Sequence, residues 1–367
     1  MSIPKTIKGI GSVNEKEWTS PQELEYSPRK FNDEDVLIRI DYCGICGSDV
    51  HTMSGGWGRY RNLVPGHEIV GRAMKVGSKV KSIKAGDRVG VGPMAGSCGE
   101  CKLCLSDNEH YCKKVISTYR SKNYKADNYF MQGGYATHII VEENFVFSIP
   151  DGIPSNVAGP LMCAGLTVFS PLYRNLKDNN NEKLVGIIGI GGLGHLAIMF
   201  AKALGAKVVA FSRSNSKKQD ALSLGADDYV ATGEDTNWVS KYEREFDVLL
   251  NCASSFTDIN YQSFFGALKV QGNFITVGSP ELSETLDLHA VQLVVSGIAL
   301  GGSLAGSKKE ALVMLDLAAK RKIFPVIEEL PMSVENVKHG WQKVQKSDVK
   351  YRLVLTGIQN HFAKPKL

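Results

Sequence analysis

The sequence lacks long runs of charge of one sign, segments of low complexity and obvious internal repeats. Its formal net charge of +5 over 367 residues is too small to indicate a nucleic-acid partner. The most apolar stretch, from Val291 to Leu300, is too short to span a bilayer. We therefore expect neither nucleic acid nor a membrane among the partners of this chain.

An apolar segment of the kind found in secretory signals is also missing from the first residues, Met1 to Lys5. The chain has eight cysteines, a number that could form disulfides. Their clustering, the chain length and the missing signal favour instead thiolates that hold metal in a reducing cytosol. We therefore expect a cytoplasmic protein.

The composition, 43% hydrophobic and 22% charged, is typical of a globular protein, and the length predicts two domains. The N-terminal third predicts a β-rich domain of short strands between glycine turns, expected to be a small barrel. Its clearest strands are expected at 6–10, 35–40, 69–76 and 87–91. Residues 35–40 alternate with period two, which predicts a half-buried strand.

From about Ser155 the pattern changes to strands that alternate with helical segments, which predicts a doubly wound parallel sheet. Strands are expected at 208–212, 246–252 and 272–278. An amphipathic helix over 308–320 and a closing strand at 351–355 follow. Because the sheet already has its strands, we expect this last part to return to the β-rich domain.

A glycine motif organises the second domain. Gly189, Gly191 and Gly194 form G-x-G-x-x-G between an apolar strand, 184–190, and an apolar helical face. The first glycine permits a tight turn, the second lets backbone N–H groups approach a pyrophosphate, and the third lets the helix pack close to the strand. The helix N-terminus presents N–H groups to the phosphates. The motif predicts dinucleotide binding, with a chance glycine turn as the alternative.

Four cysteines, at positions 98, 101, 104 and 112, form the pattern C-x2-C-x2-C-x7-C. Short loops of this kind let four thiolates converge on one tetrahedral ion and leave no position for a substrate. The pattern predicts a closed, structural zinc site made by Cys98, Cys101, Cys104 and Cys112. An iron–sulfur cluster and disulfides are the alternatives, but the usual ferredoxin spacing and its terminal proline are missing.

A second, more dispersed set consists of Cys46, His67 and Cys163. Two thiolates and an imidazole make an open zinc site, in which the fourth position is left for water or substrate. From the spacing alone these three residues are plausible ligands and no more.

The order of these motifs resembles that of the zinc-dependent medium-chain alcohol dehydrogenases. The similarity rests on Gly66-His67-Glu68-Ile69-Val70-Gly71, on the four-cysteine segment and on Gly189-Ile190-Gly191-Gly192-Leu193-Gly194, and it spans nearly the whole chain. Two further segments are most similar to the cinnamyl alcohol dehydrogenase branch: Cys46-Gly47-Ser48-Asp49-Val50-His51 and Val349-Lys350-Tyr351-Arg352.

The resemblance implies an α/β fold with a GroES-like β-rich catalytic domain over 1–158, a Rossmann NADP-binding domain over 159–304 and a C-terminal return over 305–367. It also implies two zinc ions per subunit, one catalytic and one structural, and a homodimer. The expected activity is hydride transfer between NADP(H) and a primary alcohol/aldehyde pair, either aromatic (cinnamyl-type) or medium-chain.

The resemblance also assigns site residues. Cys46, His67 and Cys163 match the catalytic zinc ligands, and Glu68 matches a residue that can occupy the fourth position when no substrate is bound. Ser48 and His51 match a proton relay, although His51 could also be a histidine of a surface loop. The cofactor site is expected to include the motif residues Gly189, Gly191, Gly192, Leu193 and Gly194, together with Arg352.

For several residues near the expected catalytic site, the sequence allows two interpretations. Asp49 could orient His67 as an outer carboxylate or could cap a helix start. Five apolar residues are candidates for a substrate pocket, and a core or surface position is about equally good for each: Met53, Trp57, Tyr60, Met94 and Tyr119.

The turn after the second expected Rossmann strand indicates which dinucleotide binds. An NAD-preferring site places Asp or Glu about 20 residues after the glycines, whereas this turn contains Ser212, Arg213 and Lys217 and no acid before Asp220. A hydroxyl, a guanidinium and an ammonium suit a 2′-phosphate. The turn predicts NADP(H), with a basic solvent-facing turn as the alternative.

Two other functions stay open at this point. One is a zinc-free quinone or enone reductase of the same fold, which would require the zinc ligands to be absent. The other is a non-enzymatic binding protein that retains the fold.

Overall fold

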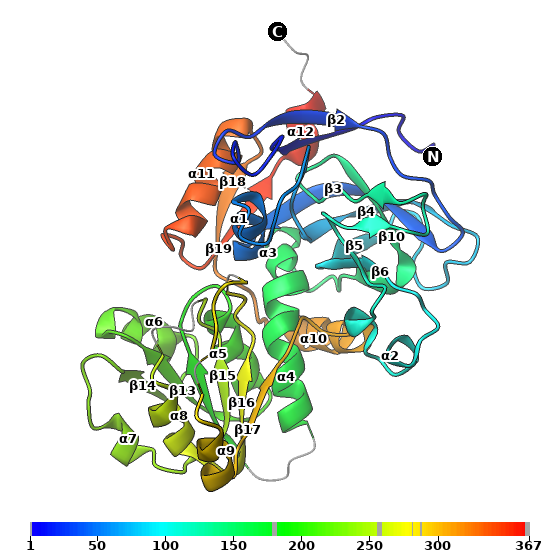
Figure 1. Ribbon diagram of the computed structural model, residues 1–367. Helices are drawn as coiled ribbons and strands as arrows, with labels where there is room; N and C mark the ends of the chain where they lie inside the picture. Colours follow the sequence, from blue (N-terminus) through cyan, green and yellow to red (C-terminus); the bar gives the residue numbers. More distant parts are fainter. Residues whose placement is uncertain (1, 178–181, 255–258, 281, 287, 364–367) are drawn as a thin grey trace. The chain divides into compact units, whose positions relative to one another are not determined.

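The computed structural model of the chain describes residues 2–177, 182–254, 259–280, 282–286 and 288–363. The chain forms two compact units (Figure 1). The first unit comprises Met1–Cys163 and Ser307–Leu367, and the second comprises Ala164–Gly306. The expected domain boundaries, 158/159 and 304/305, lie a few residues from the boundaries of these units.

The main sheet of the first unit is built along β3 (Asp35–Ile45). β4 (Glu68–Val76) pairs antiparallel with β3 along most of its length. On the other edge, β10 (His138–Glu142) pairs with the first half of β3 and β19 (Arg352–Thr356) pairs with the second half. This arrangement brings the chain's last strand beside Cys43 and Ile45, next to the segment that carries Cys46.

Three short strands extend this seven-stranded sheet at its ends. β5 (Arg88–Val91) and β11 (Val146–Ser148) continue it beyond β4, and β18 (Ile327–Pro331) lies parallel to β19. Pairing among the described strands does not close this sheet into a ring. The expected β-rich domain is confirmed, and its main sheet is an open path of strands at the level of backbone hydrogen bonds.

The start of β3 is buried on both faces, which differs from the half-buried strand that its alternation predicts. On the face that was expected to meet solvent, Leu37 is buried, and so is the polar residue Asp35. Its carboxylate accepts two hydrogen bonds from the Arg29 guanidinium, at 2.6 and 2.7 Å. A bidentate ion pair compensates a buried charge well, so the polar residue of the pattern could be buried.

The remaining elements of the first unit are short, apart from the helices α10 and α11. They are β1 (Ile7–Gly11), β2 (Gln22–Tyr26), α1 (Gly47–Met53), β6 (Met94–Gly96), α2 (Lys102–Leu105), η1 (Glu109–Tyr111), β7 (Ile116–Ser117), β8 (Lys122–Asn123), β9 (Tyr129–Phe130), η2 (Glu143–Phe145), α3 (Ser155–Pro160), the π-helical turn η3 (Leu161–Gly165), α10 (Lys308–Arg321), α11 (Val334–Gln345) and α12 (Ile358–Ala363).

The second unit contains six parallel strands in the order β14-β13-β12-β15-β16-β17. The third, second, first, fourth, fifth and sixth strands of the unit thus follow one another, which is the strand order of a Rossmann fold. The α/β fold class is confirmed. The strands are β12 (Leu184–Ile188), β13 (Lys207–Ser212), β14 (Asp228–Ala231), β15 (Phe246–Asn251), β16 (Leu268–Thr276) and β17 (Ala299–Gly302).

The helices of this unit are α4 (Leu166–Leu176), α5 (Gly194–Ala203), η4 (Asn215–Lys217), α6 (Lys218–Ser223), α7 (Trp238–Lys241), α8 (Tyr261–Ala267) and α9 (Ala290–Ser296). Its core is rich in aromatic side chains. The ring of Phe211 lies edge to face against Trp238, Phe264 and Phe246, with ring centroids 5.1, 5.2 and 5.5 Å away. These contacts fix the end of β13, where the expected phosphate turn begins.

Candidate metal centres and dinucleotide site

The four cysteines of the expected structural site converge in space. Their sulfur atoms are separated by 3.8 Å (Cys98–Cys104), 3.6 Å (Cys101–Cys104), 3.8 Å (Cys101–Cys112) and 3.5 Å (Cys98–Cys112). Thiolates bound to one tetrahedral Zn²⁺ at ~2.3 Å lie about 3.8 Å apart, whereas disulfide sulfurs are bonded at about 2.05 Å. The observed spacing fits a zinc ion and not disulfides.

Local backbone geometry supports thiolates at this site. Cys98 and Cys101 precede α2, Cys104 lies within it and Cys112 follows η1. Backbone N–H groups of Glu100 and Cys101 lower the pKa of Cys98 to about 6. Donors of this kind stabilise the deprotonated sulfur that a metal requires.

The second set of ligands also converges, and all of it lies in the first unit. Donor atoms of Cys46, His67, Glu68 and Cys163 lie within 4.8 Å of one another, and all four residues are buried. The His67 Nε2 atom is 3.2 Å from Cys163 Sγ, and the two sulfurs are 4.0 Å apart. This spacing suits one tetrahedral ion held by two sulfurs and one nitrogen.

Three separate elements supply these ligands. Cys46 lies between β3 and α1, His67 and Glu68 lie at the start of β4, and Cys163 lies on the π-helical turn η3. Turns of this type are frequent at functional sites because they displace one residue from regular helical spacing.

Two glycines let His67 and Glu68 occupy these positions. Gly66 has φ +103°, and a Cβ atom there would lie 2.5 Å from the Tyr135 ring. A Cβ atom on Gly44 would lie 2.0 Å from Glu68 Oε2. Any larger side chain at either position would push the ring or the carboxylate out of place, so the glycines are required by the site.

The electrostatics of the two thiols are asymmetric. The hydrogen bond with Cys163, followed by the charge of Arg352, holds the pKa of Cys46 well below its usual value. The same hydrogen bond and burial raise the pKa of Cys163. Both sulfurs must be thiolates to hold zinc, so metal binding would release any proton that the pair carries.

Glu68 is engaged by Arg352. The guanidinium forms a buried ion pair with Glu68 Oε1. Burial raises the pKa of Glu68 to about 8, and the Arg352 charge opposes this rise. The structure thus places Arg352 beside the ligand cluster, in the first unit. Its assignment to the cofactor site stays a prediction.

Asp49 has contacts that fit both of the roles that were open for it. Its Oδ2 accepts the backbone N–H of Cys46 at 2.9 Å, at the start of α1. Its Oδ1 lies 3.5 Å from His67 Nδ1, so that Nε2 is the ring nitrogen that faces the two cysteines. Burial raises the pKa of Asp49, and the charge of His67 acts against this effect.

Ser48 and His51 lie on α1, three residues apart and thus on neighbouring positions of one helix face. Ser48 Oγ is 3.5 Å from Cys46 Sγ, so the hydroxyl adjoins the ligand cluster. The His51 ring is partly exposed and stacks on Trp57, with centroids 5.6 Å apart and an angle of 15°.

The five pocket candidates divide into two groups. Met53, Tyr60 and Tyr119 are buried in the core of the first unit. The Tyr60 hydroxyl donates to the carbonyl of Met53 at 2.9 Å, which gives this ring a structural role. Trp57 and Met94 are partly exposed.

The glycine turn has the geometry that dinucleotide binding requires. Gly189 has φ +86° and makes the turn at the end of β12. A Cβ atom on Gly191 would meet nothing within 4 Å, so the space over this residue is open. On Gly194 it would lie 1.9 Å from the Gly189 carbonyl oxygen, which shows how closely α5 packs. His195, which follows, is fully buried in this packing.

The turn after β13 is held by the two residues that follow β14. Backbone N–H groups of Thr232 and Gly233 donate to the carbonyls of Ser212 and Arg213, at 2.8 and 3.0 Å. Lys217 Nζ donates to the carbonyl of Ile190, in the glycine turn, at 2.7 Å. Partial burial of the amine, and then the positive charge of Arg213, lower the pKa of Lys217. Lys217 is thus held beside the glycine turn, and a second cation that acts on it, Arg213, adds to a positive charge that suits an anionic ligand.

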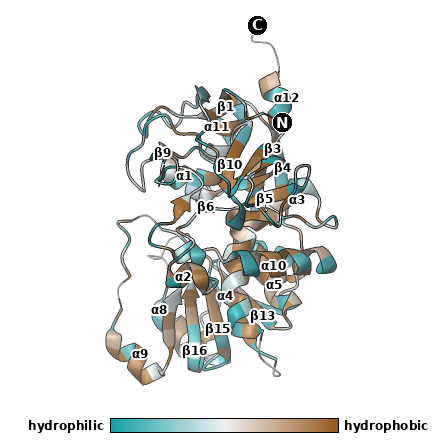
Figure 2. Ribbon diagram, turned by 90° about the vertical axis from the view of Figure 1, so that its right-hand side faces the viewer, coloured by the Kyte–Doolittle hydropathy of each residue, from teal (hydrophilic) through white to brown (hydrophobic). Residues whose placement is uncertain are grey.

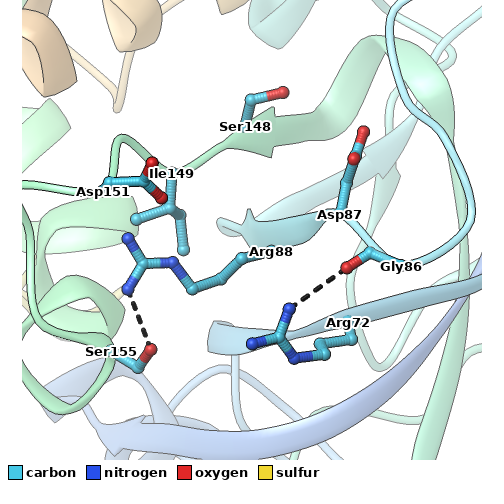
Figure 3. A pocket seen from close by; sticks show the side chains of 8 residues that line it. All are labelled: Arg72, Gly86, Asp87, Arg88, Ser148, Ile149, Asp151 and Ser155. Atoms are coloured by element: carbon cyan, nitrogen blue, oxygen red, sulfur yellow. Dashed lines mark hydrogen bonds between the residues drawn. The ribbon is translucent and has the colours of Figure 1, made fainter.

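Sequence reasoning missed two features here. Glu234, beyond β14, accepts the backbone N–H of Asn215 at 3.1 Å, so an acid from a different loop does reach this turn. The structure also has a hollow of about 550 Å³ in the first unit, lined by polar and charged residues such as Arg72, Arg88 and Asp151 (Figure 3). None of the proposed ligand or relay residues lines it, so it is not part of the candidate site.

None of the helices in the described residues combines the length and apolar character that a membrane crossing needs.

Comparison with known proteins agrees with this geometry. The model of the alcohol dehydrogenase GroES-like domain matches residues 32–151, and that of the zinc-binding dehydrogenases matches residues 192–320. NADP-dependent alcohol dehydrogenase 6 from Saccharomyces cerevisiae is 42% identical over 365 residues, which are 99% of this chain and 100% of the relative.

Two solved structures are similar over nearly the whole chain. A cinnamyl alcohol dehydrogenase from Sorghum bicolor superposes with a TM-score of 0.88 at 32% identity, covering 96% of this chain and 98% of the other. CAD from Helicobacter pylori, complexed with NADP(H), gives 0.86 at 32% identity, covering 96% and 99%. The chain therefore belongs to the zinc-binding dehydrogenases with a GroES-like domain. Within them it is similar to NADP-dependent and cinnamyl alcohol dehydrogenases.

Proposed function

We propose that this chain is a zinc- and NADP(H)-dependent alcohol dehydrogenase that also acts as an aldehyde reductase. The observation that carries the proposal is the buried cluster of Cys46, His67 and Cys163, beside which Glu68 is engaged by Arg352. Two thiolates and one imidazole with an exchangeable fourth position are the ligand set of catalytic zinc, for which alcohol dehydrogenases are the familiar example.

The residues around this cluster have distinct tasks. When bound, zinc would polarise the substrate's oxygen and NADPH would supply the hydride. Ser48 Oγ, beside Cys46, would donate a proton to the substrate oxygen in reduction and accept it in oxidation. His51, partly exposed one turn further along α1, would exchange that proton with solvent.

The cofactor is proposed to bind the second unit through residues of the glycine motif, with Ser212, Arg213 and Lys217 at the 2′-phosphate. The open space over Gly191 and the hydrogen bond that holds Lys217 beside the glycine turn support this assignment. Arg352 would add a further cationic contact to the cofactor.

The substrate is proposed to be an aromatic, cinnamyl-type or medium-chain primary alcohol and its aldehyde. Similarity to the cinnamyl alcohol dehydrogenase from Sorghum bicolor supports the aromatic class. Trp57 and Met94 are the partly exposed members of the apolar set and are the proposed substrate contacts.

A homodimer is proposed from the surface of the second unit. β17 is an end strand of the described sheet, and the side chains of Val291, Val294 and Val295 on α9 are exposed. The ribbon of α9 is coloured mostly as hydrophobic in Figure 2. An unpaired strand edge beside an apolar helix is a surface that proteins normally cover. None of the eight cysteines is in a disulfide, and their grouping as metal ligands supports a reducing, cytoplasmic location.

The test is reduction of cinnamaldehyde, benzaldehyde and hexanal by the full chain with NADPH or NADH, before and after zinc removal by a chelator. We expect NADPH-dependent reduction that disappears with the metal. Reduction of the conjugated C=C bond of cinnamaldehyde that survives complete zinc removal would favour the zinc-free reductase. Binding of NADPH without any turnover would favour the non-enzymatic protein.

A further inference from the structure

Asp49 receives more hydrogen bonds than a helix start requires. The backbone N–H groups of Cys46 and Gly66 donate to its two oxygens at 2.9 and 3.2 Å. Two tyrosine hydroxyls also donate, Tyr119 to Oδ1 at 2.8 Å and Tyr135 to Oδ2 at 2.9 Å. The side chain is fully buried, so these donors replace water for a charged group that burial would otherwise destabilise.

Both tyrosines are themselves held against the ligand turn. The Tyr119 ring stacks on the His67 imidazole, with centroids 5.6 Å apart and an angle of 21°. The Tyr135 ring lies where a Cβ atom of Gly66 would be, and it packs on Trp341 at 6.4 Å. Neither ring can move far, so each hydroxyl approaches Asp49 from a fixed direction.

We propose that Tyr119 and Tyr135 are positioning residues for the zinc ligand His67, acting through Asp49. This inference rests on the proposed function. One hydroxyl on each carboxylate oxygen fixes the plane of Asp49, and Asp49 faces His67 Nδ1 at 3.5 Å. The orientation of the ring, and with it the direction of Nε2 toward Cys163, then depends on both hydroxyls.

The alternative is that the hydroxyls only satisfy a buried carboxylate and contribute stability. The two interpretations differ in what the variants lose. Groups that orient a histidine ligand typically cost 10–100-fold in metal affinity when they are removed. A merely structural pair would lower the melting temperature and leave zinc binding unchanged.

The experiment compares Tyr119→Phe, Tyr135→Phe and the double variant with Tyr129→Phe as a matched control. Tyr129 also donates its hydroxyl to a single acceptor, the carbonyl of Ser27 at 2.9 Å, and it does not contact Asp49. Full-length protein with two zinc ions is challenged with a chelator, and the release of each ion is followed. Cobalt substituted into the Cys46 site reports the ligand geometry by its absorption spectrum.

We expect one zinc ion to leave about 10-fold faster in each single variant, with an altered cobalt spectrum, while the ion of the four-cysteine site leaves as in the wild type. The Tyr129→Phe variant should behave as the wild type. In a D49N background, adding Tyr119→Phe should have no further effect, because the hydroxyl acts through the carboxylate.

Wild-type zinc release and cobalt spectra in both single variants would overturn the inference. Should Tyr135→Phe fail to fold, Tyr119→Phe and its control decide the question. Zinc release does not depend on turnover. A wild-type protein without dehydrogenase activity would therefore refute the proposed function, but the zinc-release rates of the tyrosine variants could still be compared.

Discussion

At the Cys46 site, the neighbours of a side chain, more than its residue type, determine the direction of its pKa shift. Cys46 and Cys163 have the same side chain, yet their pKa values are shifted in opposite directions because each is the other's hydrogen-bond partner. Glu68 is a carboxylate whose pKa burial raises to about 8, despite the adjacent Arg352 charge. Glu68 lies within the ligand cluster and is paired with Arg352, and its expected exchange at the fourth position of the zinc stays a prediction.

Replacing one cysteine in each cluster should separate the two zinc sites. We expect Cys46→Ala to keep the fold, retain one zinc per chain and lose several kcal/mol of transition-state stabilisation, roughly 1,000-fold or more in turnover. Cys101→Ala should instead lower stability, since a structural zinc contributes folding energy. Metal analysis, circular dichroism and aldehyde reduction measure these effects. One zinc per active wild-type chain would contradict the assignment of two sites.

The Ser48 hydroxyl should matter for turnover and not for stability. Ser48→Ala is expected to lower kcat about 100- to 10,000-fold, the range of a general acid–base step, with an unchanged melting temperature. His51→Gln should have a smaller, pH-dependent effect, because solvent can partly replace an outer relay member. Ser223→Ala, which removes a hydroxyl bonded to the Asp220 carbonyl, is the control. Full turnover in Ser48→Ala would remove this residue from the proton path.

At the scale of elements, the turn between β13 and η4 illustrates how a strand end becomes a recognition surface. Aromatic packing around Phe211 fixes β13, and backbone hydrogen bonds from residues 232 and 233 fix the turn. Lys217 then bridges from this turn to the glycine turn through the Ile190 carbonyl. The cations are therefore placed by two strands and not by local sequence alone.

Reversing charge in this turn should change cofactor preference. Arg213→Asp combined with Lys217→Ala is expected to weaken NADPH binding by about 2 to 4 kcal/mol, because attraction at the 2′-phosphate becomes repulsion. NADH lacks that phosphate and should be affected much less. Values of kcat/KM for both cofactors, with Lys218→Ala as a neighbouring control, test this. A wild-type enzyme that uses NADH as well as NADPH would show that the turn does not select.

The four-cysteine segment is joined to α10 by a buried carboxylate. Glu109, 4% exposed, accepts the backbone N–H of Lys308 at 2.6 Å, at the first residue of the helix. An anion at a helix N-terminus is also favoured by the helix dipole. On the exposed side, Asp107 forms an ion pair with Lys309 at 3.0 Å.

These two carboxylates form a matched pair for mutation. Glu109→Gln is expected to lower the free energy of unfolding by about 1 to 2 kcal/mol, because a buried, charge-assisted hydrogen bond is weakened. Asp107→Asn should cost at most about 0.5 kcal/mol, since exposed ion pairs contribute little. Denaturant unfolding of the zinc-loaded protein provides both values. Equal losses of unfolding free energy in the two variants would show that the buried hydrogen bond contributes no more stability than the exposed ion pair.

At the scale of the whole molecule, features built from consecutive residues could be predicted from the sequence, and contacts between residues far apart in the chain could not. The alternation of strands and helices predicted the Rossmann sheet, because β12, the glycine turn and α5 are consecutive. The pairing of β3 with both β10 and β19 could not be predicted, and neither could the Arg352–Glu68 pair, whose members are 284 residues apart. Tyr119 and Tyr135 had no local signal of a role at Asp49, because only the fold brings their hydroxyls together.

The surface of α9 and β17 provides the last prediction. Val294 and Val295 are 81% and 74% exposed, beside a strand that pairs with only β16 among the described strands. In a dimer with two-fold symmetry each residue is present twice at the interface, so one substitution places two charges there.

We expect wild-type protein to sediment as a dimer and Val294→Glu to sediment as a monomer, because an unpaired charge buried in an apolar interface costs several kcal/mol. Leu105→Glu is the control, since Leu105 is 75% exposed but lies in the four-cysteine segment. That variant should remain dimeric, which would show that charge on an exposed apolar residue is not disruptive in general. Dimers in all three proteins would place the interface elsewhere, and a monomeric wild type would refute the dimer itself.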